Sequence, residues 1–252
     1  MHLKNGYWYF KGALPKEFCN NIIELGKKNI QQDIEQGISV KGTTAGRSEK
    51  GGENAGDINI GEKTREELDF KENEKKGFIR DSEVTWLNHP DLYKEIIPYI
   101  KTANENSGWN FQFDYHEQFQ FTKYTPGGFY GWHSDGESDS SGVYRRFIPG
   151  ITPLDERKKP LDTKRTLDSN MIGKVRKISA TISLNDPEEY EGGNLKFDFG
   201  PHSTGDRFVE CIEARTQGSV IVFPSFQYHC VTPVTKGTRY SLVLWTLGYP
   251  FK

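Results

Sequence analysis

The spacing of apolar residues changes near residue 109, and this change does most to limit the possible folds. Residues 109–124, WNFQFDYHEQFQFTKY, alternate between apolar and polar side chains as a half-buried strand does. Three later runs have the same character, namely 175–185 (VRKISATISLN), 192–200 (GGNLKFDFG) and 218–248. Aromatic residues make up 13% of the chain, and its 26 glycines suit many turns. This part of the chain therefore predicts an antiparallel sheet or barrel.

The preceding part has a helical spacing instead. Residues 15–28, PKEFCNNIIELGKK, predict an amphipathic helix with Pro15 in its first turn. Residues 90–104, PDLYKEIIPYIKTAN, predict one helix or two short ones, because Pro98 interrupts the pattern. The fold class is therefore predicted as α+β, with supporting N-terminal helices and a jelly-roll-like centre.

Two polar segments interrupt this pattern. Residues 37–79 contain eight glycines, many charges and few apolar side chains, which predicts a long flexible insertion. Residues 136–172 are also polar and charged, and predict a second, lid-like insertion; the alternative for both is a solvated surface loop. We expect a single domain over 1–252, with 1–36 as helical support and 80–252 as the jelly-roll core.

Charge and cysteine content narrow the class of protein. The formal net charge of −2 and the pI of about 6.3 do not indicate nucleic-acid binding by a basic surface, although a basic groove remains compatible with them. The three cysteines are far apart in sequence and odd in number, which argues against a disulfide framework and for a reducing compartment. No apolar run is long enough for a signal peptide or a membrane anchor, so we expect a soluble, cytoplasmic protein.

The stretch GGFYGWHSDGE contains a possible half of a metal site. If it forms a strand, His133 and Asp135 point to the same side. Alone, this pair is more often an ordinary polar patch. A second imidazole is available from His229, and Arg239 follows it ten residues later. The turn residues Lys236-Gly237 predict a hairpin that brings Arg239 beside the His229 strand, where its guanidinium suits a carboxylate ligand.

These residues and their surroundings resemble a known family. The motifs YTPGGFYGWHSD, RKISATISLN, EGGNLKF and VIVFPSFQYHCVTPVTKGTRYSLVLW occur in the order seen in Fe(II)- and 2-oxoglutarate-dependent dioxygenases, specifically the prolyl 4-hydroxylase-like branch. The resemblance covers about residues 109–248 apart from the second insertion. It implies a double-stranded β-helix in which His133, Asp135 and His229 are the iron ligands.

The same resemblance implies roles for further residues. The cosubstrate side chains would be Tyr124, Arg239, Thr181, Ser183, Leu195 and Ser241. Many prolyl hydroxylases have a tyrosine where Ser183 stands, so this position departs from the family pattern. The candidates on the substrate side are Tyr130, Trp132, Trp245 and Arg80. Outside the resemblance, Tyr124 is more simply interpreted as a core aromatic residue.

The implied activity is hydroxylation of a C–H bond coupled to oxidative decarboxylation of 2-oxoglutarate to succinate. Fe(II) is the implied cofactor, 2-oxoglutarate and O₂ are the cosubstrates, and ascorbate is expected to support activity. The expected partner is a proline-containing peptide or protein, and neither nucleic acid nor a membrane is expected; the oligomeric state stays open. The alternatives are the same chemistry on a free amino acid, another small molecule or a nucleobase, and a non-catalytic jelly-roll binding module.

Overall fold

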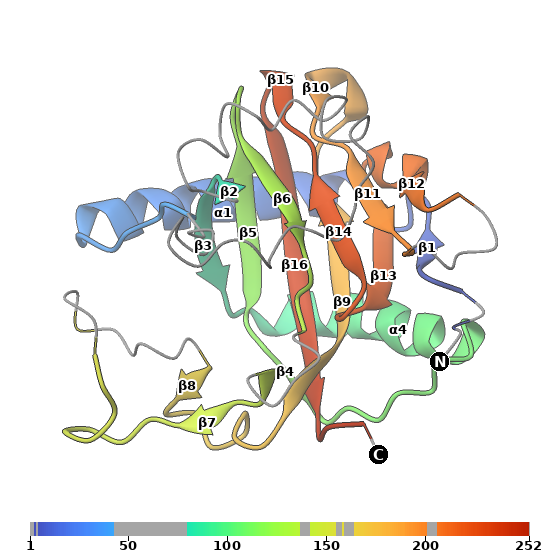
Figure 1. The fold of residues 1–252 in the computed structure, drawn as a ribbon. Coiled ribbons are helices and arrows are strands. Elements are labelled where there is room, and N and C mark those ends of the chain that lie inside the picture. Colours follow the sequence, from blue (N-terminus) through green and yellow to red (C-terminus); the bar gives the residue numbers. More distant parts are fainter. Residues whose placement is uncertain are drawn as a thin grey trace.

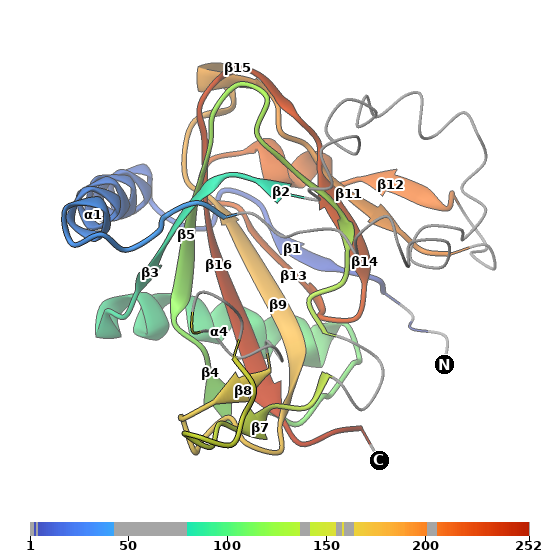
Figure 2. The ribbon, with the colours of Figure 1, turned by 60° about the vertical axis from the view of Figure 1, so that its left-hand side comes forward.

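The computed structural model describes residues 3, 5–42, 80–136, 142–154, 158, 164–200 and 206–251. In this part of the chain, two helices lie against one face of a seven-stranded sheet, and a five-stranded sheet lies across its other face (Figures 1 and 2). The helices are α1 (Lys16–Glu35) and α4 (Pro90–Asn106). The two facing sheets form the jelly roll that the strand pattern predicts.

The large sheet has the strand order β1-β13-β9-β16-β5-β3, and β4 pairs with one end of β16. Its pairings are all antiparallel. The strand bounds are β1 (Trp8–Phe10), β3 (Glu83–Leu87), β4 (Tyr115–His116), β5 (Phe119–Tyr124), β9 (Val175–Ser183), β13 (Val220–Pro224) and β16 (Arg239–Gly248).

The small sheet has the order β12-β11-β14-β6-β2 and is also antiparallel. Its strands are β2 (Arg80–Asp81), β6 (Phe129–His133), β11 (Leu195–Asp198), β12 (Phe208–Glu210) and β14 (Tyr228–Val231). A separate pair joins β10 (Tyr190–Gly192) to β15 (Val234–Gly237). Two short 3₁₀ helices, η3 (Pro187–Glu189) and η4 (Ile212–Arg215), connect strands on this side.

The alternation along β9 and β16 separates the core from the space between the sheets. Ile178, Ile182 and Leu242 have no exposed surface and pack toward the helices. The intervening residues of β9 and β16, most of which are polar or aromatic, point to the opposite face. On β16 these include Arg239, Ser241, Val243 and Trp245, and all four line one pocket between the sheets.

Both helices differ from their predicted bounds. α1 continues to Glu35, since Ile30 extends its buried stripe by two turns beyond residue 22. α4 is a single helix that passes through Pro98. Ile96 and Ile100, on either side of the proline, are fully buried, so packing on the sheet outweighs the hydrogen bond that the proline removes.

The two predicted insertions are partly ordered against the core. The Val84 amide donates to the Val40 carbonyl at 2.7 Å, so the start of the first insertion follows the edge of β3, whereas residues 43–79 lie outside the described part. In the second insertion, β7 (Arg145–Arg146) and β8 (Arg165–Thr166) form a parallel pair. Tyr144 before them is buried against Trp245, so this segment is not simply a solvated loop. Residues 137–141, 155–157 and 159–163 lie outside the described part.

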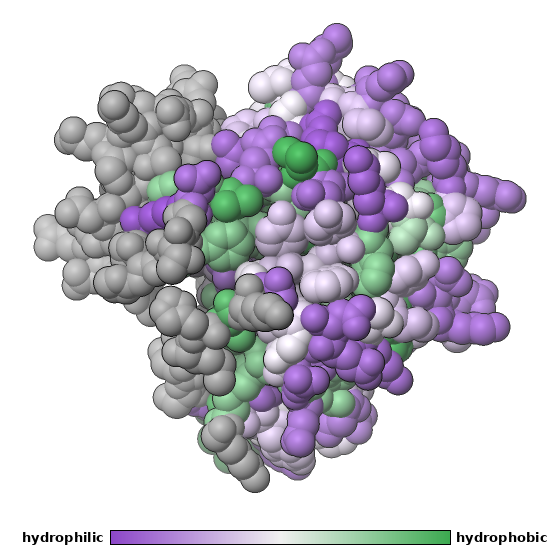
Figure 3. All heavy atoms as spheres, turned by 90° about the vertical axis from the view of Figure 1, so that its right-hand side faces the viewer, coloured by the Kyte–Doolittle hydropathy of each residue, from purple (hydrophilic) through white to green (hydrophobic). Residues whose placement is uncertain are grey.

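The surface agrees with a water-exposed exterior on the side shown in Figure 3. Outside the grey atoms, hydrophilic and neutral residues dominate this face, and apolar residues are scattered among them. Within the described residues, neither helix combines the length and the apolar character needed to cross a bilayer.

Candidate metal and cosubstrate site

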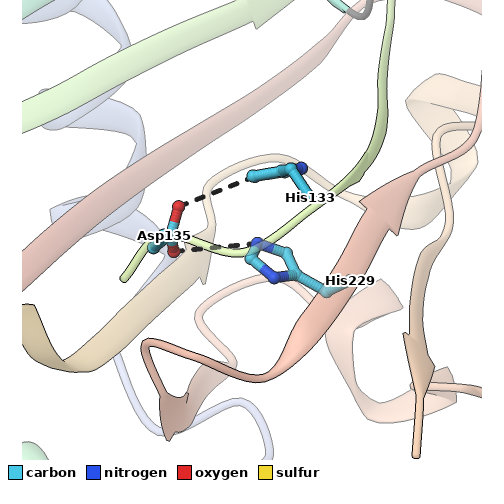
Figure 4. Close-up of side chains that lie close together, drawn as sticks. All are labelled: His133, Asp135 and His229. Atoms are coloured by element: carbon cyan, nitrogen blue, oxygen red, sulfur yellow. Dashed lines mark ion pairs between the residues drawn. The ribbon is translucent and has the colours of Figure 1, made fainter. Parts of the chain in front are cut away.

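Three side chains with metal-binding atoms meet between the two sheets. His133 ends β6 and lies directly opposite His229 of the neighbouring strand β14. Asp135 follows two residues after the end of β6, and its carboxylate lies 3.6 Å from Nε2 of His133 and 3.7 Å from Nε2 of His229 (Figure 4). One ligand atom from each of the three residues lies within 4.8 Å of the other two. The three donors thus converge on a common point.

Backbone carbonyls fix the orientation of both imidazole rings through their Nδ1 atoms. Nδ1 of His133 lies 2.7 Å from the carbonyl of Gly131, and Nδ1 of His229 lies 2.9 Å from the carbonyl of Gln227. A carbonyl only accepts hydrogen bonds, so each Nδ1 carries the proton and each Nε2 presents a lone pair toward Asp135. Backbone carbonyls hold metal-binding histidines in this way in many metalloproteins.

The charge states also suit a metal ion. Burial raises the pKa of the Asp135 carboxyl, but the adjacent His229 and His133 outweigh it and hold the pKa below the usual range. Burial, followed by the neighbouring His133, lowers the pKa of His229 to about 4. At neutral pH Asp135 is therefore ionised and His229 is neutral. Two imidazoles and one carboxylate on one side of an open position are the donor set of non-haem Fe(II) oxygenases, so these residues fit Fe(II).

Two serines support the carboxylate. Ser179 of β9 donates from Oγ to Oδ2 of Asp135 at 2.8 Å. The same hydroxyl lies 2.9 Å from Oγ of Ser225, which follows β13. Asp135 is therefore held by residues of the large sheet, whereas both histidines come from the small sheet. The donor set bridges the two sheets.

A buried arginine lies in the same pocket. Arg239 begins β16 directly opposite Tyr124 of β5, and its guanidinium lies 5.4 Å from the centroid of the Tyr124 ring. The side chain is buried, and its Nη1 donates to Oγ of Ser241 at 3.2 Å. Within the described residues no carboxylate pairs with it. A buried guanidinium without an anion fits one carboxylate of 2-oxoglutarate.

A glycine makes room for this arginine. Gly193 has φ +63°, in the left-handed region, and a Cβ at this position would lie 2.8 Å from Cδ of Arg239. Any side chain here would therefore be strained and would press on the arginine stem. Gly193 therefore leaves the space that the Arg239 side chain occupies.

Most of the predicted site residues meet in this pocket. The triad shares the pocket with eight of the other predicted residues, namely Arg80, Tyr124, Tyr130, Thr181, Leu195, Arg239, Ser241 and Trp245. Nε1 of Trp245 is buried without a hydrogen-bond partner within the described residues. The structure does not bring Trp132 and Ser183 into the pocket.

Trp132 points away because it is next to His133 on β6, and a bulge in this strand brings Tyr130 to the pocket side. Opposite the two-residue step from His229 to Val231 on β14, β6 takes three residues, from Tyr130 to His133. The extra residue shifts the alternation, so that Tyr130 and His133 share the pocket side. Their rings stack with a centroid distance of 3.5 Å. Trp132 instead stacks on Tyr228, on the outer side of the sheet.

Ser183 is occupied elsewhere. Its hydroxyl donates to the carbonyl of Ala214 in η4, so it ties that helix to the end of β9. The strand alternation places it on the pocket side of β9, but the hydrogen bond turns the hydroxyl toward η4. The Ser183 hydroxyl is therefore used to attach η4 to β9.

Two geometric expectations were wrong although the residues still converge. β14 and β16 belong to different sheets, and the predicted turn at Lys236-Gly237 lies in β15, which pairs with β10. Arg239 therefore faces His229 across the pocket and not along a hairpin. Asp135 lies beyond the end of β6, so its position comes from the chain leaving the strand and from Ser179.

Sequence reasoning missed four polar residues of the site. Gln120 and Thr122 of β5 line the pocket, and Ser179 and Ser225 hold Asp135. The signal for the first pair was the alternation FQFT, in which the polar residues occupy the face opposite the core. Ser179 alternates with Ile178 and Ala180 in the run 175–185, so it occupies the face opposite the core, whereas nothing local distinguished Ser225.

Comparison with known proteins assigns the chain to a superfamily. A family model described as the 2OG-Fe(II) oxygenase superfamily matches residues 119–247, which is about half of the chain and spans the triad, Tyr124 and Arg239. The chain belongs to the 2OG-Fe(II) oxygenase superfamily. Enzymes of this superfamily use Fe(II) as cofactor and 2-oxoglutarate and O₂ as cosubstrates. The donor set and the buried guanidinium described above fit these groups.

Relatives of known name are similar over part of their length. A PKHD-type hydroxylase of Klebsiella pneumoniae is 31% identical over 127 residues, which cover 50% of this chain and 41% of that protein. The PKHD-type hydroxylase YbiX of Escherichia coli is 39% identical over 68 residues, or 27% of each chain. The chain thus spans less than half the length of these curated relatives.

Two solved structures have a similar fold. A prolyl-4-hydroxylase of Pseudomonas putida aligns with a TM-score of 0.52 and 16% identity, covering 96% of this chain and 92% of the other. The viral collagen prolyl hydroxylase of Paramecium bursaria Chlorella virus-1 aligns with a TM-score of 0.51 and 16% identity, covering 97% of both chains. At this identity the similarity shows the fold alone.

Proposed function

We propose that this protein is a hydroxylase of the prolyl 4-hydroxylase type that acts on a proline-containing peptide or protein. The observation that carries the proposal is the triad of His133, Asp135 and His229 with its open side facing Arg239 in one pocket. The named relatives are hydroxylases, and two prolyl hydroxylases share the fold. The same domain is proposed to extend over residues 1–252.

In this proposal the three triad residues hold Fe(II). The backbone carbonyls behind the two imidazoles keep both Nε2 atoms aimed at the metal position, and Ser179 keeps the carboxylate turned toward it. When bound, the iron, 2-oxoglutarate and O₂ supply the oxidation, which releases succinate and CO₂ and places one oxygen atom in a C–H bond of the substrate. The protein contributes position and a pocket enclosed by the two sheets.

Arg239 and Tyr124 are proposed to bind the far carboxylate of 2-oxoglutarate. The guanidinium would make paired hydrogen bonds to it, and the Tyr124 hydroxyl would add a third. Ser241 holds the guanidinium through Nη1, and Thr181 and Leu195 form the neighbouring wall. These contacts fix the cosubstrate without entering the reaction.

Tyr130, Trp245 and Arg80 are proposed to form the substrate side. Tyr130 stacks on His133 and therefore covers the metal ligand from that side. Trp245 lines the same pocket. The lid role predicted for the second insertion is compatible with Tyr144 packing on Trp245 and stays a prediction.

The proposal is tested by measuring succinate with Fe(II), 2-oxoglutarate, ascorbate and a panel of proline-rich peptides. We expect slow succinate production without peptide and faster production with a matching one, together with a mass gain of one oxygen atom on the peptide. For Arg239→Met we expect a large rise in the 2-oxoglutarate concentration needed, with Fe(II) affinity largely kept. Activity that requires no 2-oxoglutarate, or an Arg239→Met variant with unchanged requirement, would contradict the assignment.

A further inference from the structure

Arg80 is a second buried arginine that lines the iron pocket. It is 7% exposed and lies on β2, at the edge of the small sheet next to β6. Its Nε donates to Oγ of Ser82 at 2.9 Å, and its Nη2 donates to Oε1 of Gln120 at 2.8 Å. Every one of these partners is neutral. Within the described residues no carboxylate pairs with Arg80, and Nη1 has no hydrogen-bond partner.

The guanidinium lies close to the metal position. Arg80 is directly opposite Tyr130 in the pairing of β2 with β6, and its guanidinium lies 4.6 Å from the centroid of that ring. The same Tyr130 ring stacks on the His133 ring with a centroid distance of 3.5 Å. A buried positive charge and a triad histidine therefore contact the same aromatic ring.

Two arginines that are less buried than Arg80 nevertheless each have an acidic partner. Arg176 is paired in a bidentate manner with Glu117, and Arg207 with Asp198. Arg239 has no acid, and the proposed function gives it a carboxylate of 2-oxoglutarate. A buried guanidinium is costly without an anion, so Arg80 is expected to receive one as well. 2-Oxoglutarate has two carboxylates, and the proposed function uses one at the iron and one at Arg239.

We infer that Arg80 binds a carboxylate of the substrate, next to the carbon that is hydroxylated. This inference rests on the proposed function and narrows its substrate class to carboxylate-bearing molecules. The planar fork of the guanidinium fits a carboxylate through paired hydrogen bonds. That carboxylate has two possible sources, an acidic side chain beside the reacting residue or the free α-carboxylate of the reacting residue itself. Both place the anion within one residue of the reacting carbon.

The experiment compares matched substrates that differ only in this charge. One pair is a proline peptide with glutamate beside the proline and its glutamine counterpart. The second pair is a peptide that ends in proline with a free carboxylate and its C-terminal amide, and free L-proline with L-prolinamide forms a third. For one pair we expect a kcat/KM on the order of ten- to a hundred-fold higher for the carboxylate member. The pair that shows the preference identifies the source of the anion.

Variants of Arg80 connect the preference to this side chain. In Arg80→Gln we expect the ratio between the two members of the pair to fall to about one. Arg80→Lys keeps the charge but loses the fork, so it should retain only part of the ratio. Lys123→Gln is the matched control, because Lys123 lies on β5 close to the pocket but pairs with Glu83 outside it. This control should keep the full ratio.

Two outcomes would overturn the inference. One is equal turnover of both members of every pair, complete lack of turnover included. The other is an Arg80→Gln enzyme that keeps the preference but needs much more 2-oxoglutarate, because Arg80 would then serve the cosubstrate. Succinate production by the wild type without peptide, and its loss in Asp135→Ala, tests the proposed function separately. Absence of that basal reaction would count against the proposed function itself.

Discussion

Trp245 borders two clusters of buried charge, and they differ in how their charges are balanced. In one cluster, the carboxylate of Glu117 accepts two hydrogen bonds from Arg176, at 2.6 and 2.7 Å, and one from the Tyr144 hydroxyl at 3.0 Å. The Arg176 guanidinium also lies 3.8 Å from the centroid of the Trp245 ring. In the other cluster, Asp135 faces two imidazoles, and the pocket arginines face no acid.

The difference separates a structural cluster from a binding site. The Glu117 cluster is neutral as a whole, and each acidic oxygen has a donor, so nothing remains for a ligand to supply. Burial alone would lower the pKa of Arg176, but Glu117 outweighs burial and raises it. The triad and the two pocket arginines are left with unbalanced charge, which a metal ion and anionic ligands would neutralise. Substitutions in the two clusters should therefore affect different quantities.

The largest effect is expected at Asp135. In Asp135→Ala the metal loses its only charged ligand, so we expect Fe(II) affinity and succinate production to fall by more than about a thousandfold. The free energy of unfolding of the metal-free protein should fall by no more than about 1 kcal/mol, because a buried charge is removed together with its contacts. Metal titration, succinate assay and urea unfolding measure the three quantities. Asp114→Ala, which removes a half-exposed acid paired with Lys174, is the matched control.

Glu117→Ala should show the reverse pattern, with its main effect on the free energy of unfolding and not on Fe(II) affinity. It leaves the Arg176 guanidinium without its acid, so we expect a loss of about 3 kcal/mol in the free energy of unfolding. The double variant Glu117→Leu with Arg176→Met removes both charges and should recover much of this loss. Urea unfolding of the metal-free proteins checks both expectations. If Glu117→Ala cost less than about 1 kcal/mol, the cluster would not be the structural element described here.

Ser179→Ala should have an intermediate effect, with moderate losses of both Fe(II) affinity and stability. The Ser179 hydroxyl orients the Asp135 carboxylate, so its removal should lower Fe(II) affinity by roughly ten- to a hundred-fold, with a stability loss of about 1 kcal/mol. Ser183→Ala is the matched control on the same strand. Its hydroxyl bonds to Ala214 and not to the site, so a similar stability loss should leave Fe(II) affinity unchanged. Equal losses of Fe(II) affinity in the two variants would contradict the role of Ser179 in orienting the Asp135 carboxylate.

The contrast also shows what the sequence could predict. Alternation in the strand runs was enough for the jelly roll and for the shared face of Arg239 and Trp245, because burial on one side imposes a period of two. The same rule would place Tyr130 on the side opposite His133, but one extra residue in β6 inverts the alternation and no local signal marks the bulge. At Pro98 the sequence left one helix or two short ones open, and packing of the flanking isoleucines keeps a single helix.

Contacts between residues far apart in the chain were the other feature that the sequence could not predict. The metal-binding residues and the arginine were recognisable from residue type and order, but their relative placement depends on two sheets meeting face to face. A hairpin between His229 and Arg239 was the simplest local connection, and the actual chain changes sheets between them. The Glu117 to Arg176 pair joins residues 59 apart, so neither residue signals the other in the sequence.

The smallest effect concerns His116, which lies next to Glu117 on the structural side. Burial, and to a smaller extent Lys101, lowers the pKa of His116 from 6.5 to about 4. Between pH 6.5 and 4 the unfolded chain binds this proton and the folded protein does not, so stability is complete above pH 6.5 and falls as the pH decreases toward 4. Because the ring is partly solvated, we expect a contribution of only about 1 kcal/mol between pH 7 and 5. His229 titrates in the same direction, so the measurement is the difference in this slope between wild type and His116→Gln. If the two slopes were equal, His116 would not be the group that titrates.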